Sequence, residues 1–313
     1  MAAIVQTPQR GSQSAASIEA LRGVLVPALT PFTADYQPDR AAFAEFCSWL
    51  LAQGANGLAV FGTTSEANSL SLAERMSLFD HLIEKGIPAQ ALVPGTGACN
   101  LPEAIQLTKA AVDAGAGGVL VLPPFYYKNV PEDGIFAYYA EIIERVGAAR
   151  LRLFLYHIPQ MSGVAITPAI ISRLLAAYGT VIAGLKDSSG SWESTELFLR
   201  EFPGLAIYPS SERWLVPGLK AGAAGCISAT ANFQVASIRR LIDTPDGDAR
   251  ESLNAEVSRV RGIFEKVPLV PALKAAMADR FGRDSWRIVR PPLCPLSDTL
   301  RGELRQAIGA AKS

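Results

Sequence analysis

Eight short apolar segments recur along the chain, with helical patterns between them. They span residues 23–30, 57–62, 90–94, 118–123, 151–157, 181–186, 205–209 and 224–229. Their apolar character is continuous rather than alternating, which is typical of strands covered on both faces in a parallel sheet. Eight strand–helix units in succession favour the α/β class and a (β/α)8 TIM barrel, with a doubly wound sheet as the weaker alternative.

The pattern becomes purely helical after the eighth apolar segment, which predicts a C-terminal helical extension. Helix starts are marked by local chemistry, such as the capping box of Ser71 and Glu74 and the N-cap and proline pair Thr167-Pro168. We therefore expect a flexible N-terminal tail over residues 1–17, a barrel over 18–232 and a helical region over 233–313.

Charge and cysteine content limit the class of partner. Lys plus Arg and Asp plus Glu both number 29, so no net charge favours binding to nucleic acid or an anionic membrane. The four cysteines, at positions 47, 99, 226 and 294, show neither zinc-site nor disulfide-scaffold spacing, and we expect no metal and no cofactor. Residues 1–17 lack the apolar region of a signal peptide and no later run predicts a membrane span. These features predict a cytoplasmic protein with small-molecule partners.

Lys186 lies in a segment that has the pattern of a buried strand. A buried ammonium is unfavourable unless it is paired or loses its proton. A neutral lysine amine is a nucleophile that forms Schiff bases with ketones. The alternative is that Lys186 reaches out from a strand end and pairs with Asp187, and the segment alone leaves both interpretations open.

The barrel architecture predicts where a site would lie, because such barrels carry their active sites at the C-terminal ends of the strands. Nearly all the unusual polar and hydroxyl-bearing residues of the predicted barrel follow those ends. They occur in residues 30–32, 62–66, 123–128, 156–159, 186–189, 210–213 and 227–230. We expect them to meet at one mouth.

An imine-forming lysine needs a place for the substrate carboxylate and a proton shuttle. Two nearby features fit these needs. The turn Gly62-Thr63-Thr64-Ser65-Glu66 offers backbone N–H groups and hydroxyls to an anion, although capping of a short helix is an alternative role. Tyr156 lies one predicted strand before Lys186. Its ordinary pKa of about 10 requires a nearby positive charge or a hydrogen-bond relay for proton transfer, and packing at a strand end is the alternative role.

Four motifs in order resemble the dihydrodipicolinate synthase and N-acetylneuraminate lyase superfamily of class I pyruvate-dependent aldolases, over roughly residues 20–290. The motifs are the turn at 62–66, Tyr126-Tyr127, Tyr156-x-Ile-Pro with Ser162-Gly163, and the run from Gly184 to Gly190. The resemblance implies that Lys186 forms the imine, that Thr63 and Thr64 hold the pyruvyl carboxylate, and that Tyr156 shuttles protons through Thr64 and Tyr127. It also implies a homotetramer, a dimer of dimers in which Tyr127 reaches a neighbouring site. The expected substrate-binding set is Gly62, Thr63, Thr64, Met161, Ser188, Ser210, Arg213 and Ile227.

Departures from the family pattern bear on the second substrate. Met161 stands where the synthases usually carry an arginine for that substrate's carboxylate, and a thioether cannot supply this contact. The run Ser210-Ser211-Glu212-Arg213 differs from the sialate lyase pattern. Arg213 is interpreted either as a contact for an anionic tail or as a solvated helix start. His157 is interpreted either as a hydrogen bonder behind the site or as a donor that faces the acceptor substrate.

The sequence therefore predicts a class I, Schiff-base-forming lyase. Its predicted substrates are pyruvate or another 2-oxo acid, and it would make or break a carbon–carbon bond to an aldehyde, or dehydrate or deaminate a 2-keto-3-deoxy-type acid. One alternative is a 4-hydroxy-tetrahydrodipicolinate synthase. Another is a non-catalytic regulator that binds 2-oxo acids, although such a protein would not need Lys186, Tyr156, Thr64 and Tyr127 together.

Overall fold

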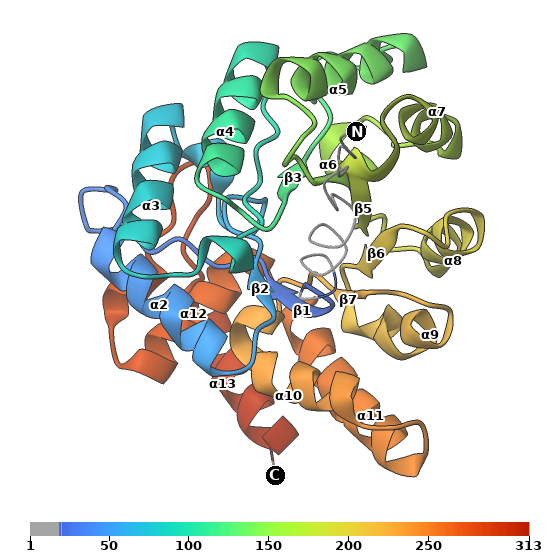
Figure 1. The fold of residues 1–313 in the computed structure, drawn as a ribbon. Helices are drawn as coiled ribbons and strands as arrows, with labels where there is room; N and C mark the ends of the chain where they lie inside the picture. The colour runs from blue at the N-terminus through green and yellow to red at the C-terminus, as the bar shows by residue number, and fades with distance from the viewer. Residues whose placement is uncertain (1–18, 20, 313) are drawn as a thin grey trace, which may run out of the picture.

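The apolar segments of the sequence form short buried strands in two sheets (Figure 1). The computed structural model describes residue 19 and residues 21–312. One sheet has the order β2-β1-β7 and the other β3-β4-β5-β6, and every strand pair is parallel. The strands are β1 (Gly23–Val26), β2 (Gly57–Leu58), β3 (Val119–Val121), β4 (Leu153–His157), β5 (Ile182–Asp187), β6 (Ala206–Pro209) and β7 (Gly225–Cys226).

Hydrogen bonds join the two sheets into a ring of eight segments. The predicted strand at 90–94 is not a regular strand, in part because Pro94 has no N–H to donate. It still fills the position between β2 and β3, since Val93 N donates to Leu58 O and Leu120 N donates to Pro94 O, both at 2.9 Å. Across the other gap, Ala224 N donates to Ile207 O at 2.9 Å. The ring is the predicted (β/α)8 barrel.

The helices that follow these segments surround the strands (Figure 1). Ser71 and Glu74 form the predicted capping box, and the Thr167 side chain accepts a hydrogen bond from Ile170 N. The helices are α2 (Arg40–Ala52), α3 (Leu72–Glu84), α4 (Leu101–Asp113), α5 (Glu132–Val146), the short α6 (Pro159–Ser162), α7 (Pro168–Tyr178), α8 (Trp192–Glu201), α9 (Leu215–Lys220) and α10 (Ala231–Asp243).

The C-terminal region is helical, with α11 (Asp248–Phe264), α12 (Leu269–Phe281) and α13 (Asp298–Lys312). Most of α12 is buried, from Pro271 to Ala278. The predicted boundary at residues 232 and 233 falls inside α10, which packs against β1, and the domain limits stay a prediction. The predicted tail at 1–17 lies outside the described residues. Within the described part of the chain, no helix combines the length and apolar character needed to cross a membrane.

Side chains alternate between the inside and the outside of the barrel. On β4, Leu153 and Leu155 pack into the large outer core, whereas Phe154 and Tyr156 belong to a smaller inner cluster with Tyr208. Tyr156 and Lys186 are direct partners in the register of β4 and β5. Because paired residues of parallel strands share a face of the sheet, both side chains point inward at the C-terminal ends of their strands.

We expect Gly184→Ala to destabilise the barrel without touching the lysine two residues later. A Cβ at Gly184 would lie 2.2 Å from Ala206 O and 2.7 Å from Phe154 Cδ1, so β5 and β6 must separate. Such overpacking costs about 1–3 kcal/mol, which thermal unfolding followed by circular dichroism would detect. Gly204→Ala is the control, since a Cβ there meets no heavy atom within 4 Å. Equal melting temperatures for the two variants would contradict this packing.

Candidate active site

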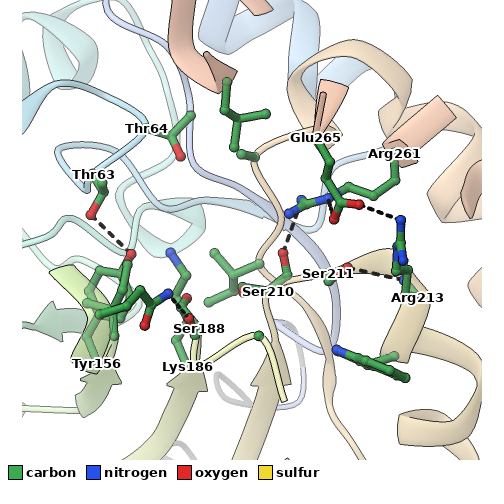
Figure 2. A pocket seen from close by; sticks show the side chains of 17 residues that line it. Thr63, Thr64, Tyr156, Lys186, Ser188, Ser210, Ser211, Arg213, Arg261 and Glu265 are labelled. Carbon is green, nitrogen blue, oxygen red and sulfur yellow. Dashed lines mark hydrogen bonds and ion pairs between the residues drawn. The ribbon is translucent and has the colours of Figure 1, made fainter. Parts of the chain in front are cut away.

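A cavity of about 320 Å³ opens at the C-terminal ends of the strands (Figure 2). This volume is at the small end of ligand pockets, which hold about 300–1,000 Å³. Its lining residues are Thr63, Thr64, Tyr156, Ile158, Gln160, Lys186, Ser188, Gly190, Ser210, Ser211, Arg213, Trp214, Ile227, Ala229, Arg261, Glu265 and Leu269. The structure therefore brings together eight of the predicted residues, namely Thr63, Thr64, Tyr156, Lys186, Ser188, Ser210, Arg213 and Ile227.

Lys186 is buried at the wall of this cavity, with its Nζ 4.1 Å from the centroid of the Tyr156 ring. An aromatic face attracts an ammonium, but it does not neutralise the charge as a carboxylate would. Asp187 does not serve as the partner. Its Oδ1 accepts a hydrogen bond from Ser189 N at 2.9 Å and its Oδ2 accepts one from Thr195 Oγ1 at 2.6 Å. The alternative interpretation of Lys186 as half of an ion pair with Asp187 is therefore wrong.

Tyr156 has an unusual electrostatic environment for a buried tyrosine. Burial acts to raise its pKa and is the largest single effect. The charge of Lys186 and hydrogen bonds with Thr63, Lys186 and Ser188 act in the opposite direction and hold the pKa below its usual value. Thr63 Oγ1 lies 3.2 Å from Tyr156 Oη. Tyr139, whose hydroxyl donates to the backbone oxygen of Val121 at 3.1 Å, has a pKa raised well above the usual value, chiefly by burial. Tyr156 is thus the buried phenol suited to exchange a proton beside Lys186.

The turn between β2 and α3 carries Thr63 and Thr64. Its internal hydrogen bonds use the N–H groups of Ser65 and Glu66, which donate to Gly62 O and Thr63 O at 3.1 Å each. Within the described residues, the N–H groups of Thr63 and Thr64 have no hydrogen-bond partner. Free backbone N–H groups at a cavity wall are suited to bind an anion. Gly62 belongs to the turn but does not line the cavity.

Charged side chains form the other end of the cavity (Figure 2). Glu265 accepts from Arg213 Nη2 at 2.6 Å and from Arg261 Nε at 2.8 Å. Arg261 Nη1 also lies 3.1 Å from Ser228 Oγ and 3.6 Å from an oxygen of the fully buried Glu212. The two guanidinium charges are therefore balanced by two carboxylates, and this end of the cavity is polar without a net charge.

Sequence reasoning missed Arg261, Glu265 and Gln160. Arg261 lies in α11, and Glu265 is the residue directly after the end of this helix. The two are four residues apart, which is the spacing of an ordinary surface ion pair. Only the packing of α11 over the barrel mouth brings them to the cavity. Gln160 lies on α6 and its Nε2 donates to Ser188 O at 2.6 Å. The family pattern singles out only the neighbouring Met161, which stands where the synthases usually carry an arginine.

Tyr127 and Met161 do not reach the cavity of this chain. Their side chains are 71% and 64% exposed, and neither lines the cavity. Tyr127 packs edge-on against Tyr126, with ring centroids 5.4 Å apart. If Tyr127 takes part in proton transfer, it must do so in the site of another subunit.

His157 lies behind the wall of the site. Its Nδ1 accepts a hydrogen bond from Ile166 N at 3.0 Å and its ring packs against Phe198. Burial lowers the pKa of His157, although Asp187 acts to raise it. This placement agrees with a hydrogen bonder that supports β4 and disagrees with a donor that faces a second substrate. In the described part of the chain, no group of three or more His, Cys, Asp or Glu side chains is placed to hold a metal ion.

Comparison with known proteins identifies the family of this chain. The sequence pattern of the Dihydrodipicolinate synthetase family matches residues 20–311. The chain belongs to this family. An uncharacterized DapA-like lyase of Chloroflexus aurantiacus is 37% identical over 288 residues, which cover 91% of this chain and 95% of that protein.

Solved structures of the same family are similar to this chain in fold. Dihydrodipicolinate synthase from Agrobacterium tumefaciens is similar at a TM-score of 0.87 and 31% identity, covering 93% of this chain and 99% of that one. YagE of Escherichia coli K12, a prophage protein of the dihydrodipicolinic acid synthase family solved in complex with pyruvate, gives a TM-score of 0.85 and 27% identity, with coverage of 93% and 98%. The family, the barrel fold and the class I lyase activity predicted from the sequence are confirmed, and the substrates are small molecules.

We expect Lys186→Met and Thr63→Val each to raise the pKa of Tyr156. The charge of Lys186 lowers this pKa more than any other neighbour does, and the hydrogen bond with Thr63 comes next, so the lysine variant should show the larger rise. Carbon-13 labelling of tyrosine Cζ would follow the titration by NMR, and the buried Tyr139 serves as an internal control. An unchanged or lower pKa in Lys186→Met would contradict the described environment.

Proposed function

We propose that Lys186 forms a Schiff base with the carbonyl carbon of pyruvate or a related 2-oxo acid. The observation that carries the proposal is a buried lysine that has no carboxylate partner among the described residues, beside a phenol whose pKa that lysine lowers. The amine adds to C2, the carbinolamine loses water, and the positively charged imine nitrogen then draws electrons from C2. Either a proton leaves C3 or the bond between C3 and C4 breaks, and both routes give an enamine.

Two neighbours supply the remaining parts of the reaction. The free N–H groups of Thr63 and Thr64 bind the carboxylate of the 2-oxo acid, because two donors on adjacent residues match two carboxylate oxygens. Tyr156 moves protons to and from the carbinolamine oxygen, and it takes the proton of the C4 hydroxyl when the C3–C4 bond breaks or returns it to the former aldehyde oxygen when that bond forms. Resemblance to the family implies a relay from Tyr156 through Thr64 and Tyr127. In this chain the threonine hydroxyl that lies within hydrogen-bond distance of Tyr156 is that of Thr63, at 3.2 Å, so the relay would begin at Thr63. Ser188 and Ile227 line the space around the imine.

The far end of the cavity, with Ser210, Arg213, Arg261 and Glu265, receives the aldehyde part of the substrate. Because Glu265 binds both arginines, this end offers hydrogen bonds without a free positive charge. A hydroxyl-bearing, uncharged aldehyde fits this environment better than one with a second carboxylate. The exposed Met161 adds no cation. These features favour a lyase for hydroxylated 2-oxo acids over a 4-hydroxy-tetrahydrodipicolinate synthase, and the paired phenol and lysine argue against a non-catalytic regulator.

We also infer a homo-oligomer, in keeping with the predicted dimer of dimers. Tyr126 and Tyr127 are 73% and 71% exposed and lie side by side. Adjacent exposed aromatic rings are typical of protein interfaces. In an assembly, Tyr127 would complete the proton relay of a neighbouring subunit. The cytoplasmic location stays a prediction.

Borohydride reduction in the presence of pyruvate tests the Schiff base directly. We expect intact-mass spectrometry to show one reduced pyruvyl group per chain, and peptide mapping to place it on Lys186. Lys186→Met should give no adduct. Tyr156→Phe should still bind pyruvate but lose about 10²–10⁴-fold in turnover, the usual contribution of a general acid or base. A folded wild-type protein without an adduct would refute the proposal.

Charge balance at the far end predicts a change of substrate preference in Glu265→Gln. The wild-type protein should condense pyruvate with glyceraldehyde faster than with aspartate semialdehyde. Glu265→Gln removes the carboxylate that binds Arg213 and Arg261. The carboxylate of aspartate semialdehyde can then form an ion pair with these arginines, which should raise the kcat/KM for aspartate semialdehyde by about tenfold. Glu141→Gln, which breaks the exposed pair with Arg145, is the matched control. A wild-type preference for aspartate semialdehyde would show that the anionic tail finds its cation elsewhere.

A further inference from the structure

A second buried lysine lies outside the cavity, on α12. The Nζ of Lys274 is 2.5 Å from Glu66 Oε1, and both side chains are fully buried. The ammonium also donates to Ile288 O at 2.7 Å and lies 4.3 Å from the centroid of the Phe32 ring. The other oxygen of Glu66 accepts from Arg290 N at 3.1 Å. Glu66 is thus held by the C-terminal region at both of its oxygens.

Glu66 is the last residue of the turn that carries Thr63 and Thr64. It has a left-handed backbone conformation, with φ 56° and ψ 36°. Phe61, the residue directly before the turn, also has a positive φ of 58°. This conformation is unfavourable for residues other than glycine and persists only where the surroundings enforce it. Between these two residues, Ser65 is fixed by its hydroxyl, which donates to Ala28 O at 2.6 Å. The side-chain anchor of Glu66 therefore holds one end of a strained turn.

Lys274 and Glu66 do not act on the substrate themselves, since neither lines the cavity. The burial of Lys274 also opposes its charge at neutral pH. Burial lowers the pKa of Lys274 to about 8, although Glu66 acts to raise it and Arg290 lowers it further. The folded protein thus holds this proton less tightly than the unfolded chain does. The protonated lysine therefore subtracts from the stability below pH 8, and this loss shrinks as the pH rises. A buried lysine with such a cost suggests a role other than stability.

We propose that the Lys274–Glu66 ion pair is a positioning couple that holds the N–H groups of Thr63 and Thr64 where they bind the substrate carboxylate. The proposal rests on the proposed function, because it concerns the anion site of that reaction. The couple links the C-terminal helical region to the turn, so α12 acts on pyruvate binding from outside the cavity. Lys274 and Glu66 are positioning residues, and Lys186 and Tyr156 remain the groups that touch the reacting atoms.

Three variants separate positioning from stability: Glu66→Gln, Lys274→Met and the double variant. Borohydride trapping over a range of pyruvate concentrations gives the concentration for half-maximal adduct and, separately, the adduct at saturation. We expect the half-saturating concentration to rise about 10- to 100-fold in all three, as for a weakened hydrogen bond to a charged group. The adduct at saturation should stay unchanged, because Lys186 is intact.

The double variant provides the decisive comparison. It leaves no unpaired buried charge, so its melting temperature should return close to that of the wild type. Its half-saturating concentration should nevertheless stay raised, since no attraction then holds residue 66. Glu45→Gln is the matched control, because the exposed pair of Glu45 with Arg283 also joins the C-terminal region to the barrel but is remote from the turn.

Two results would overturn the positioning role. The first is a double variant with wild-type stability and a wild-type half-saturating concentration. The second is a set of folded single variants that trap pyruvate as the wild type does. If the wild-type protein itself gives no adduct, the proposed function fails and this proposal fails with it. An adduct in the wild type together with either of the two results would reject the positioning role of Lys274 and Glu66 and leave the proposed function intact.

Discussion

Lys186 and Tyr156 face each other at matching positions of two neighbouring parallel strands, and the site depends on this contact. The strand register fixes the pair, because the two residues are direct partners on β4 and β5. The contact leaves the ammonium next to an aromatic face rather than a carboxylate, and it makes the buried phenol more acidic than its burial alone would allow. In the proposed reaction, one packing arrangement therefore supplies both the lysine that attacks the 2-oxo acid and the phenol that carries the proton.

The barrel and the C-terminal helices contribute different parts of the site. Strand ends supply Lys186 and Tyr156, and the turn after β2 supplies Thr63 and Thr64. The end of α11 forms the far wall, where Arg261 and Glu265 meet Arg213. Further along, α12 and residues 288–290 hold the turn by Glu66. Under the proposed function, the C-terminal region is part of the functional unit, and changes in it should alter substrate preference and pyruvate binding rather than the imine chemistry.

Much of this could be predicted from the sequence for a physical reason. Continuous apolar runs identify buried parallel strands, and the C-terminal ends of such strands meet at one mouth of a barrel. The sequence alone therefore predicts that Lys186 lies near Tyr156 and Thr63. The same reasoning fails where tertiary packing decides. Pro94 interrupts the third segment locally, although backbone hydrogen bonds keep it in the ring. Arg261 and Glu265 have the spacing of a solvated pair, and the turn motif does not distinguish Glu66 from an ordinary surface carboxylate. Nothing in their local sequence indicates burial or an approach to the cavity.

A crystal structure of the protein after borohydride reduction with pyruvate would show directly which residue forms the imine. We expect continuous density between Lys186 Nζ and C2 of the pyruvyl group. The carboxylate oxygens should lie within hydrogen-bond distance of the Thr63 and Thr64 N–H groups, and Tyr156 Oη should lie beside the former carbonyl position. Density on another lysine, or a carboxylate bound by Arg213 at the far end of the cavity, would contradict this expectation.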